Sequence, residues 1–254
     1  MGAGFAGIIA GLELEKTMRA NFVIVDQQQE VGGTWYANQY PGAEVDVPSL
    51  CYLPLDRAKK FFPTRQYSSS REIQQFIKIL VEENNLEKKL ILNCKVKSCS
   101  WDAEKCVWKT ICSRKTIDGN QCIKIQSKFL LLGVGPLAIP KFPENKVFEG
   151  VRLHSAQWNN SLEIMPDFTD KRVAIIGTGA SAAQIIPEIA KSCSRLTVFQ
   201  RTPAYCERKL NEEYSEPSTF VSEKARKEFA IRKKREFVHH SDEVFLRVFN
   251  SKKG

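Results

Sequence analysis

The sequence has no long hydrophobic run, and this absence excludes several classes of protein. No window of its 254 residues approaches the roughly 18 to 20 uninterrupted apolar residues that a membrane-spanning helix needs. The apolar segment Gly2–Leu12 lacks the basic start and the cleavage site of a signal peptide, so we expect it to be folded structure. With 43% hydrophobic and 26% charged residues, the chain can bury the core of one or two domains.

Cysteine and histidine are present, but not in metal-binding patterns. The eight cysteines include no CxxC pair, and the three histidines, His154, His239 and His240, lie far from the cysteine cluster. Zinc sites need these ligands at short spacing, so we expect no metal. A chain of this size needs no disulfide framework. The scattered cysteines therefore favour a reduced, intracellular and cytoplasmic protein.

The formal net charge is +9, which by itself suggests nucleic acid or a membrane surface as a partner. The excess is local, however. Lys224–Arg235 holds seven basic residues and one acid, so these twelve residues carry +6 of the +9. Their spacing favours a solvated helix with a narrow apolar stripe, with a nuclear-localisation or anion-binding patch as the alternative. We expect no nucleic-acid partner and no membrane span.

The chain opens with a complete GxGxxG motif over Gly2–Gly7. In a dinucleotide-binding fold the first glycine makes a tight turn, the second lets the backbone approach a pyrophosphate, and the third lets a helix pack on a strand. A strand over Phe22–Val25 ends at Asp26, at the offset where an acid meets a ribose hydroxyl. Only Met1 precedes the motif, so we expect this unit to lack its initial strand.

A second motif of the same kind begins with a strand over Arg172–Ile176. A glycine turn from Gly177 follows, then a helix to about Lys191 and a strand over Leu196–Phe199. Gln200 and Arg201 follow this strand, and Arg201 stands at the offset that Asp26 has in the first unit. An arginine there suits a 2′-phosphate. Each motif alone is also compatible with a tight turn that binds nothing. Together, with their opposite charges, they favour FAD for the first unit and NADPH for the second.

The segments between the two motifs predict a helix, a small sheet and one more strand. Within Arg71–Leu92 the apolar residues have the spacing of a helix, and the last three residues, Leu90–Leu92, predict a short strand. Phe129–Gly135 is typical of a buried strand. The sequence predicts an α/β fold of two Rossmann-like, three-layer dinucleotide-binding units, the first lacking its initial strand, with a small antiparallel β meander. The meander strands are expected at 95–101, 106–113 and 121–125.

Several further segments resemble the class B flavin monooxygenases of the Baeyer–Villiger type. Phe148–Trp158 fits the fingerprint FxGxxxHxxxW of that family, although Asn159 stands where proline or aspartate is usual. Gln200–Pro203 is similar to the family's segment after the second nucleotide-binding strand. The resemblance covers the chain from Gly2 to about Lys209. Its other segments are Gly32–Tyr36, Tyr40–Gly42 and Asp46–Ser49.

The resemblance implies a monooxygenase that uses FAD and NADPH. NADPH would reduce the flavin by hydride transfer, and O2 would add to give a flavin C4a-peroxide. The peroxide would insert one oxygen atom next to the carbonyl of a small-molecule ketone, while the protein supplies binding and orientation. Secondary metabolism is suggested only by analogy, and the sequence leaves the oligomeric state open.

The resemblance also implies roles for individual residues. Asp46 would lie beside the isoalloxazine as the catalytic group. The FAD site would comprise Gly2, Gly4, Gly7, Asp26, Thr34, Trp35, Tyr36, Asp46 and Tyr52. The NADPH site would comprise Gly177, Thr178, Gly179, Ala180, Ser181, Ala182, Gln184, Arg201 and Thr202. The hinge between the two units would contain Phe148, Gly150, His154 and Trp158.

We expect three regions: an FAD-binding domain over 1–139, a linker with the fingerprint over 140–170, and an NADPH-binding domain over 171–254 with a basic helical end. Both domains are expected to be incomplete, and the family's catalytic arginine, the partner of Asp46, has no counterpart here. Two alternatives stay open. One is a non-catalytic remnant or nucleotide-binding half of such an enzyme, and the other is an N- or S-oxidising flavin monooxygenase, whose fingerprint lacks the Trp158 position.

Overall fold

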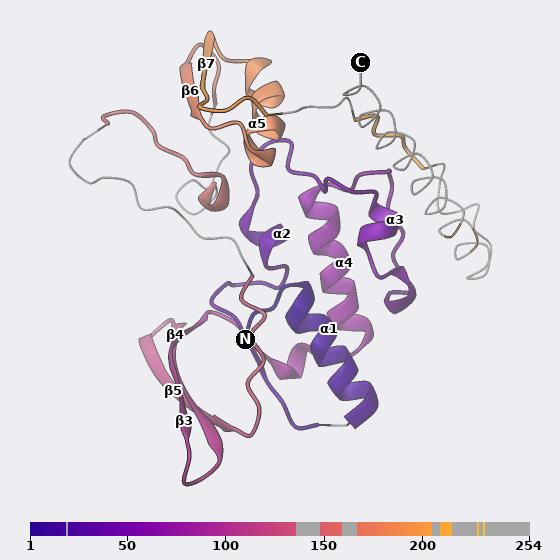
Figure 1. The fold of residues 1–254 in the computed structure, drawn as a ribbon, viewed down its shortest axis with the longest axis vertical. Coiled ribbons are helices and arrows are strands. Elements are labelled where there is room, and N and C mark those ends of the chain that lie inside the picture. The colour runs from indigo at the N-terminus through magenta and orange to yellow at the C-terminus, as the bar shows by residue number, and fades with distance from the viewer. Residues whose placement is uncertain are drawn as a thin grey trace, which may run out of the picture.

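The structure is a computed structural model that describes residues 1–18, 20–135, 148–158, 167–204 and 209–214, together with 228 and 231. The predicted basic helix over Lys224–Arg235 lies almost entirely outside the described residues, and the predicted linker over 140–170 lies partly outside them. Helices and parallel strand pairs both occur, as in the predicted α/β class, and a separate antiparallel sheet lies at one side (Figure 1).

The first unit is built on two helices and a short parallel sheet. Helix α1 (Phe5–Glu13) follows the first glycine turn and continues as the π-helical turn η1 (Leu14–Met18). Strand β1 (Ile24–Val25) pairs in parallel with β2 (Leu90–Ile91). The remaining elements are α2 (Thr34–Ala37), α3 (Ser49–Tyr52), η2 (Leu55–Arg57), α4 (Ser70–Glu83) and η3 (Glu87–Lys89).

Helix α4 forms the centre of the main core. Its N-terminus is capped by Ser69, whose hydroxyl accepts a hydrogen bond from the Glu72 N–H at 3.3 Å, and such caps stabilise a helix start. The predicted apolar stripe faces inward, because Ile73, Phe76 and Leu80 are all fully buried. The predicted helix is therefore confirmed, and it packs against α1 and β1.

The predicted meander is confirmed as a three-stranded antiparallel sheet in the order β3-β4-β5. One face of it covers Val25 through the buried side chains of Cys94 and Cys112. This small second core attaches the meander to the first unit. The strands are β3 (Cys94–Asp102), β4 (Val107–Thr116) and β5 (Gly119–Ser127).

The second unit has the predicted strand, helix and strand. Strands β6 (Arg172–Ile176) and β7 (Arg195–Phe199) are parallel and in register, and α5 (Ala180–Ala190) connects them. The short η4 (Ser155–Gln157) precedes this unit. Ile185 and Ile189 of α5 bury Trp158 in a core of their own.

Two strand predictions need correction. Phe129–Gly135 is not a strand, and Phe129 and Leu132 are 84% and 65% exposed. The predicted strand over Phe22–Val25 is reduced to the two residues of β1. The physical reason is that strand length and burial depend on neighbours, and the short β2 is the only strand with which β1 pairs in the described part of the chain.

Met1 and Gly2 lie between β1 and the segment around Leu131. The Gly2 N–H donates to the Val25 carbonyl at 2.8 Å, and the Gly133 N–H donates to the Met1 carbonyl at 2.7 Å. The Met1 amino group also donates to the Leu131 carbonyl at 2.6 Å. The backbone just before the first glycine turn therefore occupies the place that a central strand takes in such a unit. Among the described residues, no helix is both long and apolar enough to cross a membrane.

Candidate functional site

The first glycine turn is shaped by close backbone packing. Gly2 has φ +100°, and a Cβ there would lie 2.1 Å from the Gly133 carbonyl oxygen. A Cβ on Gly7 would lie 1.8 Å from the Gly2 carbonyl oxygen. Neither position has room for a side chain, so the tight turn and the close approach of the helix both require glycine.

The loop at Gly32–Gly33 crosses the middle of this turn. The Gly32 N–H donates to the Ala3 carbonyl at 3.0 Å, and a Cβ on Gly33 would lie 2.7 Å from the Gly4 Cα. Gly4 precedes α1 and provides no side-chain cap. The N–H groups of the first turn of α1 are therefore the kind of uncapped donors that bind an anion.

Asp26 lies beside the first turn, as the spacing predicted. One carboxylate oxygen accepts a hydrogen bond from the Ala3 N–H at 2.6 Å, and the other accepts from the Gln28 N–H at 2.8 Å. These bonds orient the carboxylate at the end of β1. Because each carboxylate oxygen can accept a further bond, Asp26 keeps capacity for the hydroxyl groups of a ribose.

An aromatic group adjoins the first turn. The Trp35 indole N–H donates to the Tyr52 hydroxyl at 2.9 Å, and their rings meet edge to face. Phe5 of α1 makes a second edge-to-face contact with Tyr52. Burial raises the pKa of Tyr52, the nearby carboxylate of Asp46 adds to this, and the Trp35 bond opposes it. The structure thus brings together three residues predicted for the flavin site, namely Trp35, Tyr52 and Asp46.

The remaining residues predicted near the flavin, Thr34 and Tyr36, lie on α2, whereas Asp46 lies in the loop before α3. Asp46 is exposed, and Thr34 begins α2 at the edge of the same region. Tyr36 lies on α2, and its pKa is raised by burial and by Glu30, against the opposing effect of Lys78. These positions are compatible with the predicted site but do not by themselves define a ligand.

The second glycine turn differs from the first because it is open. Gly177 has φ +107°, and its N–H donates to the Phe199 carbonyl at 2.9 Å. A Cβ on Gly177 or on Gly179 would meet nothing within 4 Å. Gly179 precedes α5 without a side-chain cap. The turn therefore presents uncapped N–H groups to open space, which fits a pyrophosphate.

Arg201 and Thr202 follow β7 beside the second turn. The Thr178 hydroxyl lies 3.4 Å from the Thr202 carbonyl oxygen, to which it donates, and this bond joins the two turns at the end of the sheet. Arg201 is exposed there. The first residues of α5 are Ala180, Ser181 and Ala182, and they lie at the same end. All the predicted NADPH residues except Gln184 thus belong to these two turns or to the first turn of α5.

The amide of Gln184 contacts the first unit. Its Nε2 donates to the Glu44 carbonyl at 2.9 Å, and its Oε1 accepts from the Tyr40 hydroxyl at 3.0 Å. No local pattern predicts this contact, because its partners are about 140 residues apart in the sequence. Lys209 and Asn211 also bind Glu44 and were likewise not predicted.

The fingerprint residues have clear local roles. The Phe148 ring lies over Gly150, where a Cβ would come within 2.6 Å of the ring. The His154 Nδ1 accepts a hydrogen bond from the Ala156 N–H at 3.1 Å and caps η4. Trp158 is only 4% exposed, and its indole N–H has no hydrogen-bond partner in the described part of the chain.

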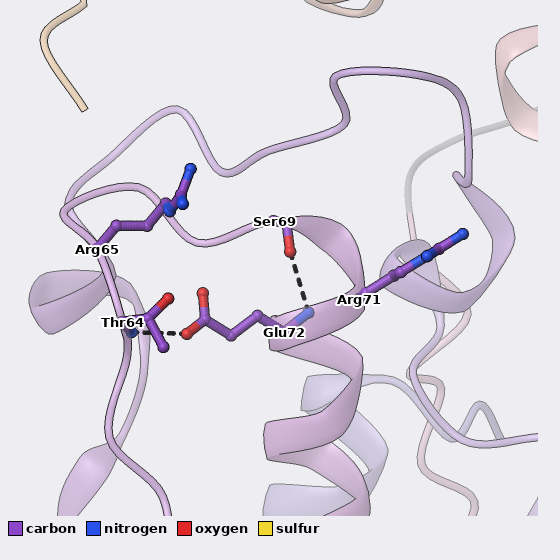
Figure 2. A pocket seen from close by; sticks show the side chains of 5 residues that line it. All are labelled: Thr64, Arg65, Ser69, Arg71 and Glu72. Atoms are coloured by element: carbon purple, nitrogen blue, oxygen red, sulfur yellow. Dashed lines mark hydrogen bonds between the residues drawn. The ribbon is translucent and has the colours of Figure 1, made fainter. Parts of the chain in front are cut away.

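A surface pocket of about 540 Å³ lies at the N-terminus of α4, and no predicted site residue is among those that line it (Figure 2). The Glu72 carboxylate accepts a hydrogen bond from the Thr64 N–H at 2.6 Å, while its own N–H is bound by Ser69. Arg65 and Arg71 also line the pocket, and the Arg71 side chain extends away from the other four (Figure 2). Ser69 and Glu72 of the lining are thus already used in hydrogen bonds at the start of α4. The described residues contain no cluster that could hold a metal ion, and the described cysteines are free thiols.

Two glycine turns on parallel strands, one beside an aspartate and one beside an arginine, define a protein with two dinucleotide-binding units. Comparison with known proteins agrees with this class. The family model of the pyridine nucleotide-disulphide oxidoreductases matches residues 1–244. The chain therefore belongs to this oxidoreductase family.

The relatives with similar sequences are monooxygenases. A Baeyer–Villiger monooxygenase of Stachybotrys chlorohalonatus is 35% identical over 215 residues, which cover 80% of this chain and 33% of the relative. The ketocytochalasin monooxygenase of Aspergillus clavatus is 36% identical over 229 residues, which cover 86% of this chain and 35% of that protein. The resemblance predicted from the fingerprint is thereby confirmed.

The solved structures agree in fold. The polycyclic ketone monooxygenase of Thermothelomyces thermophila matches with a TM-score of 0.76 and 30% identity, over 87% of this chain and 37% of that one. The structure of OTEMO in complex with FAD and NADP matches with a TM-score of 0.77 and 27% identity, over 89% of this chain and 42% of that one. The chain spans about a third of the length of the curated relatives it matches.

Proposed function

We propose that this chain forms the FAD- and NADPH-binding part of a Baeyer–Villiger monooxygenase, an enzyme that inserts one oxygen atom of O2 next to a ketone carbonyl. The observation that carries the proposal is the pair of glycine turns with opposite charges beside them. An aspartate suits a ribose with free hydroxyls, as in FAD, and an arginine suits the 2′-phosphate of NADPH. The region boundaries at 139 and 170 are part of this proposal.

The first unit would hold FAD. The N–H groups at the start of α1 would bind its pyrophosphate, and Asp26 would bind its ribose. Trp35 and Tyr52, with Thr34 and Tyr36 nearby, would line the flavin ring and exclude water from it. Bound FAD would supply the hydride acceptor and the oxygen chemistry.

The second unit would hold NADPH. The uncapped N–H groups of the second turn and of α5 face open space, which supports a pyrophosphate site there. Arg201 would bind the 2′-phosphate, and a charged hydrogen bond of this kind is stronger than a neutral one. Thr178, Ser181 and Thr202 offer hydroxyl groups beside it.

A ketone is the substrate class that the relatives support. Two of the relatives are a polycyclic ketone monooxygenase and a ketocytochalasin monooxygenase. Asp46 is exposed beside Tyr52, which is compatible with the catalytic position that the resemblance implies. Its place near the flavin and its role remain part of the proposal.

Hydride transfer between the two cofactors tests this function. The chain is loaded with FAD, freed of unbound flavin by gel filtration and mixed anaerobically with NADPH. We expect the visible flavin absorbance to bleach, and to bleach more slowly with NADH. A chain that binds both nucleotides without bleaching would favour the alternative of a non-catalytic nucleotide-binding half. A chain that binds neither would exclude the proposal.

A further inference from the structure

A direct contact joins the two units away from both glycine turns. Gln184 of α5 donates a hydrogen bond from Nε2 to the Glu44 carbonyl at 2.9 Å. Its Oε1 accepts a hydrogen bond from the Tyr40 hydroxyl at 3.0 Å. The Glu44 N–H also lies 3.5 Å from the Gln184 Oε1, to which it donates. One side chain of the second unit thus binds both ends of the loop Tyr40–Glu44, so its donor and its acceptor are both used.

Gly42 shows how closely α5 approaches this loop. Its φ is +76°, and a Cβ there would lie 2.6 Å from the Gln184 carbonyl oxygen and 3.0 Å from Glu188 Cγ. Only glycine has both the conformation and the space at this position. The loop therefore packs against the backbone of the helix, and the contact is specific in its geometry.

Glu44 binds a second segment of the C-terminal half. Its carboxylate pairs with Lys209 Nζ at 2.8 Å and accepts from Asn211 Nδ2 at 3.3 Å. Asn211 also hydrogen-bonds the N–H and the carbonyl of Tyr67. The backbone of 212–214 pairs with 64–66 through two further bonds of 2.8 Å. Glu44 is therefore held through its backbone by α5 and through its side chain by residues 209–211.

The apolar contacts lie on the same side of α5. Ile185 and Ile189 bury Trp158, and Tyr40 packs against this cluster. The fingerprint tryptophan and the Tyr40–Glu44 loop thus meet one helix face. Polar and apolar contacts together fix the helix that also presents the second glycine turn.

We propose that the Tyr40–Glu44 loop and Gln184 form a lock that sets the orientation of the second unit on the first, and that Gln184 is a positioning residue and not a nucleotide contact. The proposal deepens the proposed function and rests on it for its effect on hydride transfer. Hydride transfer requires the two reacting atoms at about 3 to 3.5 Å. An orientation lock would control that step without contributing to nucleotide affinity.

Hydrogen exchange measured by mass spectrometry on the full chain tests the lock. In Gln184→Ala we expect the amides of 40–45 to exchange roughly tenfold faster. Hydrogen bonds of this kind oppose local opening and so protect the amides from exchange. The affinity for 2′,5′-ADP, a probe for the second unit alone, should change by less than about twofold, since the substitution leaves the charge-assisted phosphate contacts in place. The matched control is Gln74→Ala, because Gln74 bonds Glu30 and Val31 within the first unit. It should leave exchange at 40–45 unchanged.

A second variant guards against a folding defect. Gln184→Glu keeps the side-chain length but loses the Nε2 donor and places a carboxylate beside the Glu44 carbonyl, so it should loosen the loop as much as alanine does. Unchanged exchange at 40–45 in either folded variant would overturn the lock. A loss of 2′,5′-ADP binding in Gln184→Ala would assign Gln184 to the nucleotide and overturn its positioning role. If the unsubstituted chain binds no 2′,5′-ADP, the proposed function fails, while the exchange comparison still decides the lock.

Discussion

Among single residues, Gly7 and Gly179 are glycine for different physical reasons. A Cβ on Gly7 would lie 1.8 Å from the Gly2 carbonyl oxygen, whereas a Cβ on Gly179 would meet nothing within 4 Å. The first position is constrained by the fold itself. The second is constrained only if a ligand occupies the open space above the turn.

Alanine substitutions separate these two reasons. We expect Gly7→Ala to lower the free energy of unfolding by about 2 to 3 kcal/mol, because the added methyl group would clash with the Gly2 carbonyl and the backbone would have to move. Gly179→Ala should cost less than about 1 kcal/mol but weaken NADP⁺ binding, since the methyl group enters the pyrophosphate space. Urea denaturation and calorimetric titration measure the two effects. Equal destabilisation by both substitutions would contradict this reading of the turns.

Arg201 is expected to decide between NADPH and NADH. Replacing it with glutamine should weaken NADP⁺ binding by roughly tenfold to a hundredfold, the value of a charged hydrogen bond, and leave NAD⁺ binding unchanged. Arg195→Gln is the matched control, because Arg195 is also exposed and begins the same strand. If both substitutions weaken NADP⁺ equally, the overall positive charge and not Arg201 is responsible.

Among helices and strands, the sequence predicted best what depends on local signals. Helix α4 carries its cap at Ser69 and its apolar stripe within one continuous segment, so its pattern sufficed. Phe129–Gly135 has the composition of a buried strand. A strand is buried only where other elements pack against it, and composition does not predict that packing. The strand predicted over Phe22–Val25 is shorter in the structure, because its length depends on pairing with the two residues of β2.

The candidate site divides in the same way. The glycine turns and Asp26 follow from short motifs, and the structure places them as the spacing predicted. Gln184, Glu44 and Lys209 meet across 140 to 165 positions of sequence, and no periodicity connects such distant residues. The contact between the units therefore became visible only in the structure.

A buried thiol in the meander predicts that the stability of the fold depends on pH. Burial, followed by the neighbouring Cys94, raises the pKa of the Cys112 thiol from 9.0 to about 11. In this range the unfolded chain has lost a proton that the folded chain keeps, so stability should fall as pH rises from 9 to 11. Cys112→Ala should flatten the decline in that window, as measured by urea denaturation at several pH values. A decline of the same slope in the alanine variant would exclude Cys112 as its source.

At the scale of the whole molecule, apolar side chains remain on the surface. Phe129, Leu132 and Val134 are 84%, 65% and 67% exposed, and Ile176 is exposed in a parallel sheet, a type of sheet that is usually covered on both faces. A contiguous exposed apolar surface promotes association. We expect the isolated chain to be marginally soluble and to bind an apolar dye.

Lysine substitutions test whether this surface causes association. Leu132→Lys should reduce the self-association seen by sedimentation and lower dye binding, because it places a charge within the apolar segment. Ile117→Lys is the control, since Ile117 is fully exposed at the hairpin between β4 and β5, apart from the segment. Equal improvement by both variants would show that added charge alone explains the effect.

The central claim is that the first unit binds a flavin. The most direct test is the visible spectrum of the purified chain after incubation with FAD and gel filtration. We predict a yellow protein that retains FAD, and less retention in Asp26→Ala, because Asp26 accepts the Ala3 N–H of the first turn and would bind the ribose under the proposed function. A folded chain, shown by circular dichroism, that emerges colourless would contradict the claim.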